Sequence, residues 1–342
     1  MPMLKIMSNK FGAMSEIGGR HVGKNLIGRL GGVGIVFGMF ISLIFQICLN
    51  PYEKTFWNQH KLELLGLILG LVPVATAGFW DDISRLPALP KLFAQVFGAV
   101  IAYSFGLRIS GIDLPLIEPI NLGWLSFPIT ILWVVGIVNA VNLIDGLDGL
   151  AGGVLLFASI VNLIAAIEVN GMLAAYLMIS MVGAVVGFLL YNWFPAKIYL
   201  GDCGAYSLGF ILSISGLLAP VQKVSTGVSL LVPGLALGLP FFDTTLVVIR
   251  RFLKQSGVFT PDRGHLHHIL LDSGISHRRV VIGLHIVCSF LCSISLLMVL
   301  KRNRYLGFVL LVASVAAIIW WGSGVKNQLK IFMTRIKYFW KH

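Results

Sequence analysis

Ten long apolar segments run through this sequence and constrain its fold more than any other feature. About twenty apolar residues in a helix cross the ~30 Å hydrocarbon core of a bilayer, where no water is present to pair with backbone polar groups. Segments of this length therefore predict an all-α polytopic transmembrane helix bundle of about ten spans. The segments cover residues 30–49, 62–80, 88–106, 124–141, 150–167, 172–191, 205–220, 228–249, 280–300 and 305–322.

The composition excludes a water-soluble domain and a disordered chain. Hydrophobic residues make up 57% and charged residues 12% of the 342 positions, whereas about a quarter of the residues in soluble domains are charged. Disordered segments are poor in apolar residues, which is the reverse of this chain. The four cysteines contain no CxxC pair, so neither a disulfide framework nor a zinc site is expected from them.

The basic residues predict which loops face the cytoplasm. Lys and Arg number 26 against 14 Asp and Glu, and basic residues concentrate in the cytoplasmic loops of membrane proteins. With both termini in the cytoplasm, 19 of the 26 fall on that side. Topology thus accounts for the excess charge, and no nucleic-acid partner is expected. The chain divides into a cytoplasmic N-terminal segment (1–29), an integral membrane domain (30–322) and a basic C-terminal tail (323–342).

The aspartates collect on the same side as the basic residues. Eight of the nine, all but Asp113, lie on the cytoplasmic side or at the cytoplasmic end of a span, whereas four of the five glutamates lie on the other side. Ionisable groups at membrane depth are costly and indicate function. Because carboxylate oxygens are ligands for hard divalent cations, the pattern predicts metal or phosphate chemistry on the cytoplasmic face. The loops expected to carry it lie near 81–91, 139–153, 192–204 and 250–279.

The first motif on this face ends the second span. Asp81 and Asp82 follow Trp80, and the basic residues Arg85 and Lys91 come next. An acidic pair at a helix end is also a common interfacial stop signal, so this motif alone does not indicate a site.

The second motif, over residues 139–153, has four polar side chains spaced three residues apart: Asn139, Asn142, Asp145 and Asp148. At 3.6 residues per turn, this spacing would spread the four around an unbroken helix. Gly146 and Gly149 are expected to interrupt the helix, which would let the Asn and Asp oxygens converge on one ligand.

The third motif precedes a new span and holds Asn192, Lys197, Tyr199 and Asp202, with glycines on both sides of the last acid. The GDxG pattern is also a common turn. The fourth motif crowds Arg263, His265, His267 and His268 into six residues of the longest cytoplasmic loop. Histidine clusters bind zinc in some proteins, but Arg and His beside a bound Mg²⁺ also donate to a diphosphate, and we favour phosphate.

Together these motifs predict phosphoryl transfer between a nucleotide-activated group and a lipid phosphate, a reaction that needs mainly positioning and charge neutralisation. Acyl transfer is disfavoured because no nucleophile elbow is present. A cation-coupled transporter would place charges near mid-bilayer in paired repeats. Here only Asp243 lies inside a predicted span and no internal repeat is evident.

In order and spacing the four motifs resemble the polyprenyl-phosphate N-acetylhexosamine-1-phosphate transferases. They read WDD at 80–82, NAVNLIDGLDGLAGG at 139–153, AKIYLGDCG at 196–204 and PDRGHLHH at 261–268. The HLHH form is most similar to bacterial undecaprenyl-phosphate GlcNAc-1-phosphate transferases, and less to phospho-MurNAc-pentapeptide translocases. Such transferases usually carry a further span before the segment matching 20–32, where this chain has 29 mostly polar or basic residues.

The resemblance implies transfer of GlcNAc-1-phosphate from UDP-GlcNAc to undecaprenyl phosphate, giving undecaprenyl-diphospho-GlcNAc and UMP. This reaction initiates a cell-envelope polysaccharide such as O-antigen, common antigen or a teichoic-acid linkage. The alternative is the same chemistry with another UDP-N-acetylhexosamine or UDP-MurNAc-pentapeptide. The implied location is the bacterial inner membrane, and a homodimer is left open.

The resemblance also implies roles for individual residues. The catalytic residues would be Asp81, Asp82, Asp145 and His265. The metal ligands would be Asn142 and Asp202, holding Mg²⁺ or Mn²⁺. The substrate-binding residues would be Lys91, Asn139, Asp148, Tyr199, Arg263, His267 and His268, with Tyr199 stacked on uracil and Asp148 at the base edge. Because a phosphate monoester with a second pKa near ~6 is largely dianionic at pH 7, we expect Asp81 to orient the lipid phosphate more than to remove a proton.

Overall fold

The structure is a computed structural model, and it is almost entirely helical. It describes residues 2–15, 26–49, 54–112, 120–218, 234–235, 238, 270–273, 275–299, 305–311 and 313–314. The helices are α1 (Pro2–Lys10), α2 (Gly31–Leu49), α3 (Lys54–Gln59), α4 (Lys61–Ser84), α5 (Ala88–Ser104), α6 (Ser126–Ile144), α7 (Leu150–Glu168), α8 (Met172–Asn192), α9 (Gly201–Ser215) and α13 (His277–Val299). A short antiparallel hairpin pairs β1 (Gly111–Ile112) with β2 (Ile120–Asn121), and the 3-10 helix η2 (Gly123–Leu125) leads into α6.

Six helices in the described part of the chain are long and apolar enough to cross a membrane: α2, α4, η2 with α6, α7, α8 and α13. Each coincides with a predicted segment, which confirms the helical membrane fold. The segments at 88–106 and 205–220 form helices of 17 and 15 residues, α5 and α9. The segments at 228–249 and 305–322 lie largely outside the described residues, so a total of ten spans stays a prediction.

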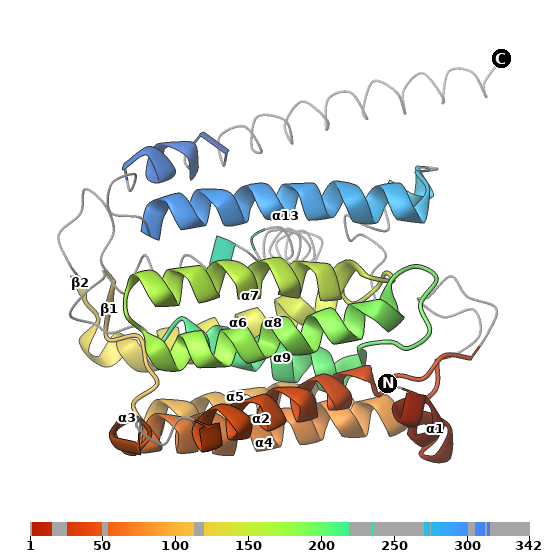
Figure 1. Cartoon of the computed structure of the whole chain (residues 1–342), viewed down its shortest axis with the longest axis horizontal. Helices are drawn as coiled ribbons and strands as arrows, with labels where there is room; N and C mark the ends of the chain where they lie inside the picture. Colours follow the sequence, from red (N-terminus) through yellow and green to blue (C-terminus); the bar gives the residue numbers. More distant parts are fainter. Residues whose placement is uncertain are drawn as a thin grey trace.

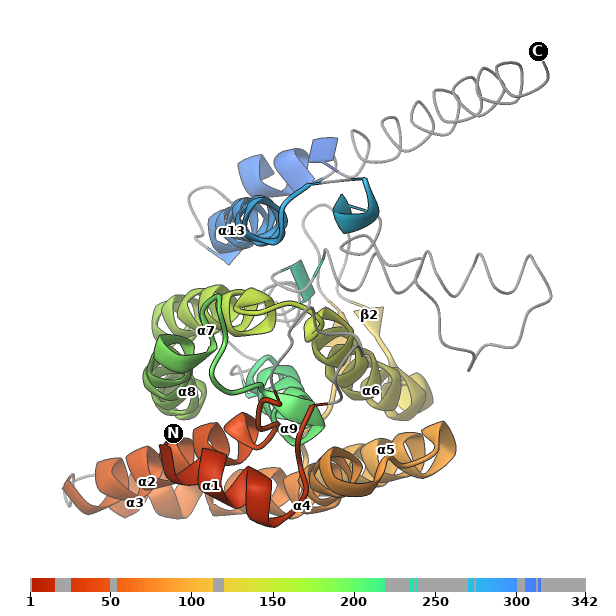
Figure 2. The same ribbon diagram turned by 90° about the vertical axis from the view of Figure 1, so that its right-hand side faces the viewer.

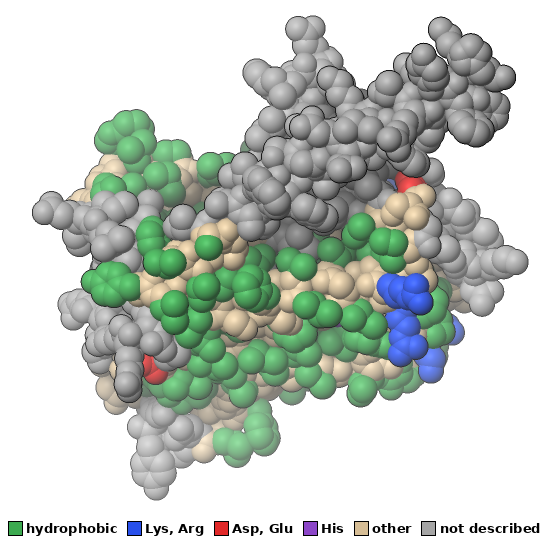
Figure 3. All heavy atoms as spheres, turned by 90° about the horizontal axis from the view of Figure 1, so that it is seen from above, with side chains coloured by type: hydrophobic (Ala, Val, Ile, Leu, Met, Phe, Trp, Pro, Cys, Tyr) green, Lys and Arg blue, Asp and Glu red, His purple; other side chains and the backbone are tan. Residues whose placement is uncertain are grey.

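The outer faces of these helices are apolar, as contact with lipid requires. Phe37 of α2, Leu132 of α6 and Leu190 of α8 are each more than 65% exposed. Seen from above, hydrophobic side chains spread along the described helices, and Lys and Arg side chains gather at one end (Figure 3). An apolar surface this extensive marks contact with a membrane or a partner, and the hydropathy of the helices assigns it to the membrane.

Helix α9 is the centre of the bundle. It contacts α2, α4, α6, α7 and α8, which surround it when the bundle is viewed along its helices (Figure 2). Every residue of α9 except Asp202 is buried. Gly32 of α2 and Gly204 of α9 meet backbone to backbone, where a side chain on either residue would overlap the other helix. Because α9 is enclosed by protein, its 15 residues do not have to match the full hydrocarbon thickness.

The chain direction brings one end of many helices together. Helices α4, α6 and α8 end, and α2, α5, α7, α9 and α13 begin, at the right-hand end of the bundle in Figure 1. The β1–β2 hairpin lies at the opposite end. The first three predicted motifs lie at the end of the bundle where α4, α6 and α8 end, and we call this the motif end.

Candidate active site

Five charged residues from four segments converge at the motif end. Arg29 precedes α2, Asp81 and Asp82 lie in the last turn of α4, Lys91 lies in the first turn of α5, and Asp202 lies in the first turn of α9. Lys91 Nζ lies 2.6 Å from Asp81 Oδ2 and 3.7 Å from Asp202 Oδ2. Arg29 Nε lies 3.5 Å from Asp82 Oδ1, and its Nη2 lies 4.0 Å from Asp202 Oδ1. We call these five residues the charged cluster.

Asp82 caps the central helix from a different helix. Its Oδ1 accepts the Asp202 N–H at 2.9 Å, and its Oδ2 accepts the Cys203 N–H at 3.0 Å. The first N–H groups of a helix have no partner within it and carry partial positive charge, so a buried carboxylate there satisfies them. Gly201 turns the chain at φ +74°, and a side chain at this position would strike the Asp82 carboxylate. Asp82 thereby fixes the position of Asp202.

Asp81 ties the end of α4 to the start of α5. Its Oδ1 accepts the Leu86 N–H across the connection, and its Oδ2 accepts a hydrogen bond from Lys91. Both oxygens are therefore engaged, and the side chain is buried. These contacts position Lys91 beside Asp202.

Asp202 is the acid of the charged cluster that is free to take a ligand. Its side chain is 16% exposed, and the two cations nearest to it stand 3.7 Å and 4.0 Å away. Among the described residues, no three His, Cys, Asp or Glu side chains form a metal site by themselves. That arrangement fits Mg²⁺, which is usually held by one or two carboxylates together with waters and substrate phosphates.

The connection between α6 and α7 is interrupted where the glycines predicted it. Helix α6 ends at Ile144, α7 begins at Leu150, and Gly149 turns the chain at φ +76°. Burial raises the pKa of Asp145 to about 7, with Arg29 opposing and the Asp82 carboxylate adding to this shift. Asp145 thus lies within electrostatic reach of Arg29 and Asp82, and its catalytic role stays a prediction.

The two asparagines of the second motif lie on α6. Asn139 Nδ2 donates to Gln95 Oε1 at 2.6 Å and to the Val135 carbonyl at 2.8 Å, which joins α6 to α5. Asn142 lies in the last turn of α6, where its backbone carbonyl accepts the Asp145 backbone N–H. The contacts of Asn139 are those of a packing residue, and its substrate-binding role stays a prediction, as does the metal-ligand role of Asn142.

Tyr199 and Asp148, the two residues predicted to bind uracil, lie together at the motif end. The carboxylates of Asp148 and Asp145 add to burial in raising the pKa of Tyr199 to about 12, so the phenol is neutral at physiological pH. Asp148 Oδ2 accepts the Ala196 N–H at 2.9 Å. The Tyr199 backbone pairs with the segment before α2 through Gly28 and Gly31. These contacts join the second and third motifs to the residues beside Arg29.

Asn192 holds two loops of the site together, a role that the sequence did not reveal. Its Oδ1 accepts the Gly149 N–H at 3.0 Å, and its Nδ2 donates to the Ile198 carbonyl at 2.9 Å. The side chain is buried at the end of α8. Because one amide satisfies both loops, Asn192 sets the distance between the loop carrying Asp148 and the loop carrying Tyr199.

Replacing Asn192 with alanine is therefore expected to leave the Gly149 N–H and the Ile198 carbonyl without partners, at a cost of about 1–3 kcal/mol for each buried group. Thermal unfolding in detergent measures this cost. Asn162→Ala is the matched control. Asn162 is also buried, and within the described part of the chain its side-chain amide donates only inside α7, to the Ala158 backbone carbonyl. Equal shifts for the two variants would contradict the bridging role.

Arg29 is the second residue that the sequence did not reveal. The sequence treats it as one of several basic residues ahead of the first span, and only the fold brings it to Asp82 and Asp202. The adjacent glycine pair at 31–32 is a signal that could have found it, since close contact of α2 with α9 draws Arg29 inward. The remaining predicted residues, Arg263, His265, His267, His268 and Asp243, lie outside the described residues.

Comparison with known proteins identifies the family. Residues 64–219, from α4 to the end of α9, match the model of glycosyl transferase family 4. The chain is 33% identical over 311 residues to the probable undecaprenyl-phosphate N-acetylglucosaminyl 1-phosphate transferase of Bacillus subtilis (strain 168), covering 91% of this chain and 84% of the relative. It is 28% identical to the decaprenyl-phosphate N-acetylglucosaminephosphotransferase of Mycobacterium leprae (83% and 76% covered). It is 31% identical to the phospho-N-acetylmuramoyl-pentapeptide-transferase of Halalkalibacterium halodurans (77% and 80% covered).

The family match covers α4, α5 and α9, which carry Asp81, Asp82, Lys91 and Asp202 of the charged cluster. The chain belongs to glycosyl transferase family 4 and is a phosphoglycosyl transferase.

Proposed function

We propose that the protein transfers GlcNAc-1-phosphate from UDP-GlcNAc to undecaprenyl phosphate, giving undecaprenyl-diphospho-GlcNAc and UMP. The observation that carries this proposal is the charged cluster, where Asp202 stands between two cations at one end of an apolar bundle. The Bacillus subtilis relative, named for this reaction, supports the sugar and the acceptor. A bacterial inner-membrane location, a cytoplasmic site and an initiating step of envelope polysaccharide synthesis belong to the same proposal.

In this reaction a lipid phosphate oxygen forms a bond to the β-phosphorus of UDP-GlcNAc. The bond from that phosphorus to the bridging oxygen breaks, and UMP leaves with the electron pair. Lys91 and Arg29 lie where they can neutralise phosphate oxygens, and Asp81 and Asp82 hold them in place. Asp202, with Asn142, would hold Mg²⁺, which stabilises negative charge on a diphosphate when bound.

Proton removal contributes little in this account. A lipid phosphate monoester is already largely dianionic at neutral pH, since its second pKa is near ~6. Both carboxylate oxygens of Asp81 are engaged with Lys91 and the Leu86 N–H. The acid therefore supports orientation of the acceptor and of Lys91, as proposed for it from the sequence.

Removing divalent metal with EDTA is expected to abolish UMP release, because Lys91 and Arg29, which are already paired with carboxylates, leave the diphosphate charge incompletely neutralised. Added Mg²⁺, and Mn²⁺ in its place, should restore the rate. The measurement is UMP release by protein purified in detergent. Activity that persists in EDTA after dialysis would contradict the metal proposal.

A second donor is favoured by one observation. The Halalkalibacterium halodurans relative, named for phospho-N-acetylmuramoyl-pentapeptide transfer, is 31% identical to this chain. UDP-MurNAc-pentapeptide, or another UDP-N-acetylhexosamine, is therefore the alternative donor for the same chemistry. Competition among these donors in the UMP assay decides between them. UDP-GlcNAc is expected to have the highest kcat/KM, and a higher value for another donor would reassign the sugar.

A further inference from the structure

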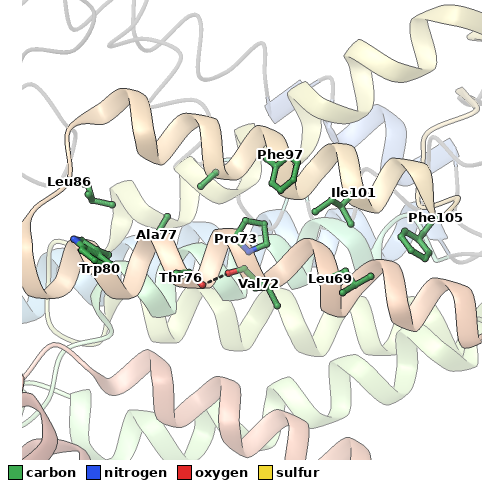
Figure 4. A pocket seen from close by; sticks show the side chains of 11 residues that line it. Leu69, Val72, Pro73, Thr76, Ala77, Trp80, Leu86, Phe97, Ile101 and Phe105 are labelled. Carbon is green, nitrogen blue, oxygen red and sulfur yellow. Dashed lines mark hydrogen bonds between the residues drawn. The ribbon is translucent and has the colours of Figure 1, made fainter.

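Two histidines of α13 contact the loops that carry Asp148 and Tyr199, although α13 holds none of the predicted site residues. Helix α13 packs along α7, across the bundle from α4 and α5 (Figures 1 and 2). The apolar groove lined by α4 and α5 (Figure 4) therefore lies away from α13. A substitution on α13 can thus be separated from an effect on that side of the bundle.

His285 holds the start of α7. Its imidazole is buried, and Nε2 lies 3.3 Å from the Leu150 backbone carbonyl oxygen, which pairs only with an N–H donor. A side chain at Gly153 would overlap this ring, so the glycine leaves the space that the imidazole fills. Leu150 is the first residue of α7 and follows Asp148 by two positions. His285 therefore fixes the helix start to which the Asp148 loop is joined.

The same imidazole contacts the segment that leads to Tyr199. Its ring and the Trp193 ring lie 6.2 Å apart, centroid to centroid, with their planes 36° apart. Trp193 also lies beside the Gly149 turn, where an added side chain would be in van der Waals contact with it. Trp193 directly follows Asn192, whose amide bonds to both loops. The imidazole, the indole and the amide thus hold the two loops against each other.

A second histidine, about two helical turns earlier, makes a similar contact. His277 begins α13, and its ring stacks on Phe194 with centroids 4.8 Å apart and planes 29° apart. Phe194 lies two positions before Ala196, whose N–H bonds to Asp148. His277 also lies within electrostatic reach of the Asp148 carboxylate. Helix α13 therefore meets the surroundings of Asp148 at two points.

The place of His285 in the helix favours a role beyond packing. It lies about two turns inside a helix that is apolar enough to cross a membrane, where polar side chains are costly. An apolar side chain of similar size would fill the same space without burying a polar group. The imidazole N–H adds a directional bond to a carbonyl, which an apolar contact does not provide.

We propose that His285, assisted by His277, is a positioning residue for the nucleotide of the donor, an inference that rests on the proposed uridine-diphosphate donor. It acts through Leu150 and Trp193, and so sets the spacing between Asp148 and Tyr199. Loss of the imidazole therefore weakens binding of the donor and of UMP. Acceptor binding is unaffected.

Replacing His285 tests this role through two variants. His285→Leu keeps the bulk and removes the N–H, and it is expected to raise the KM for UDP-GlcNAc and the Kd for UMP about tenfold. His285→Gln keeps an N–H donor and should restore both constants close to the wild-type values. The KM for undecaprenyl phosphate should stay unchanged in both. Equal rises in the donor and acceptor KM would overturn the proposal, because they would reflect a general structural defect.

His60→Leu is the matched control for His285→Leu. His60 pairs with Glu63 in the first turn of α4, at the other end of that helix from Asp81 and Asp82. Its Kd for UMP and its two KM values should equal those of the wild type. A loss of UMP affinity in this variant as large as that in His285→Leu would contradict a specific role for His285.

Gly153→Ala approaches the same contact from α7, and it serves if His285→Leu does not fold. The methyl group would displace the imidazole, while alanine is otherwise the better helix former. The UMP Kd should rise as in His285→Leu. Gly183→Ala makes the same change on α8, where a side chain meets no atom within 4 Å, and should bind UMP like the wild type. Wild-type affinity in Gly153→Ala would contradict the proposal.

A double-mutant cycle shows whether His285 acts through Asp148. Asp148→Asn alone should weaken UMP binding, measured by calorimetry in detergent. Adding His285→Leu to that variant should then cause little further loss, because both changes act on the same carboxylate. If the two effects multiply instead, His285 does not act through Asp148, and the proposal is wrong.

The binding measurement also keeps this inference separate from the proposed reaction. If the wild-type protein releases no UMP from UDP-GlcNAc, but binds UMP and loses affinity in His285→Leu, the proposed function fails and the positioning role stands. If UMP is released and His285→Leu keeps the wild-type Kd and KM, the proposed function stands and the positioning role is wrong.

Discussion

Replacing Asp202 with asparagine is expected to lower the kcat for UMP release by about a thousandfold. Asp202 is the one partly exposed carboxylate of the charged cluster, and it stands between Lys91 and Arg29. Asparagine keeps the size and the helix position but removes the charge that would attract Mg²⁺. The variant should also require a higher Mg²⁺ concentration for half-maximal rate, measured by titration in the UMP assay.

The stability of this variant separates chemistry from folding. Within the described residues Asp202 accepts no side-chain hydrogen bond, and its two ion pairs, at 3.7 Å and 4.0 Å, are long. Its thermal unfolding in detergent should therefore stay close to that of the wild type. Glu63→Gln is the control for loss of one acid, because Glu63 bonds to His60 in the first turn of α4, far along the chain from the motif end. Its activity should be unchanged. Wild-type kcat in Asp202→Asn would remove Asp202 from the site.

Replacing Asp82 with alanine is expected to have the largest effect on folding. The change leaves a part-buried and a buried N–H group at the start of α9 without acceptors, and it leaves Arg29 without its nearest carboxylate. Breaking a buried charged pair typically costs about 3–5 kcal/mol. Unfolding in detergent should therefore occur at a clearly lower temperature, and activity should fall because Asp202 is no longer held in position.

Asp82→Asn provides the graded comparison. An amide offers one oxygen acceptor where the carboxylate offers two, so one of the two helix N–H groups keeps a partner. Its unfolding temperature should lie between those of the wild type and Asp82→Ala. If Asp82→Ala unfolds like the wild type while losing activity, Asp82 acts in the chemistry and not as the cap of α9.

The membrane fold could be predicted from the sequence because hydropathy and length are local properties of each segment. The prediction of a span at 150–167 agrees with α7, Leu150–Glu168, and the interruption after Ile144 follows from glycines visible in the motif. The start of α9 was not predicted, because the 205–220 segment marks only apolar residues. The helix begins at Gly201 since Asp82, from α4, supplies acceptors for its first N–H groups.

The sequence predicts which residues gather at the site better than it predicts what each of them does. The gathering of Asp81, Asp82, Lys91 and Asp202 follows from motifs that all fall on one side of the membrane. The role of each of these residues depends on contacts between helices, such as the hydrogen bond from Lys91 to Asp81. The contacts of Arg29 and Asn192 come from the fold, because a basic residue before a span and an asparagine at a helix end have many uses in a sequence.

The transfer of the phosphate together with the sugar tests the central claim most directly. Purified protein is incubated with undecaprenyl phosphate and UDP-GlcNAc carrying ³²P at its β-phosphorus, and the lipid is then extracted into organic solvent. The proposed reaction predicts that the label moves into the lipid fraction as undecaprenyl-diphospho-GlcNAc while unlabelled UMP is released. Label that stays in water-soluble UDP while sugar enters the lipid would contradict it, as would a complete lack of transfer.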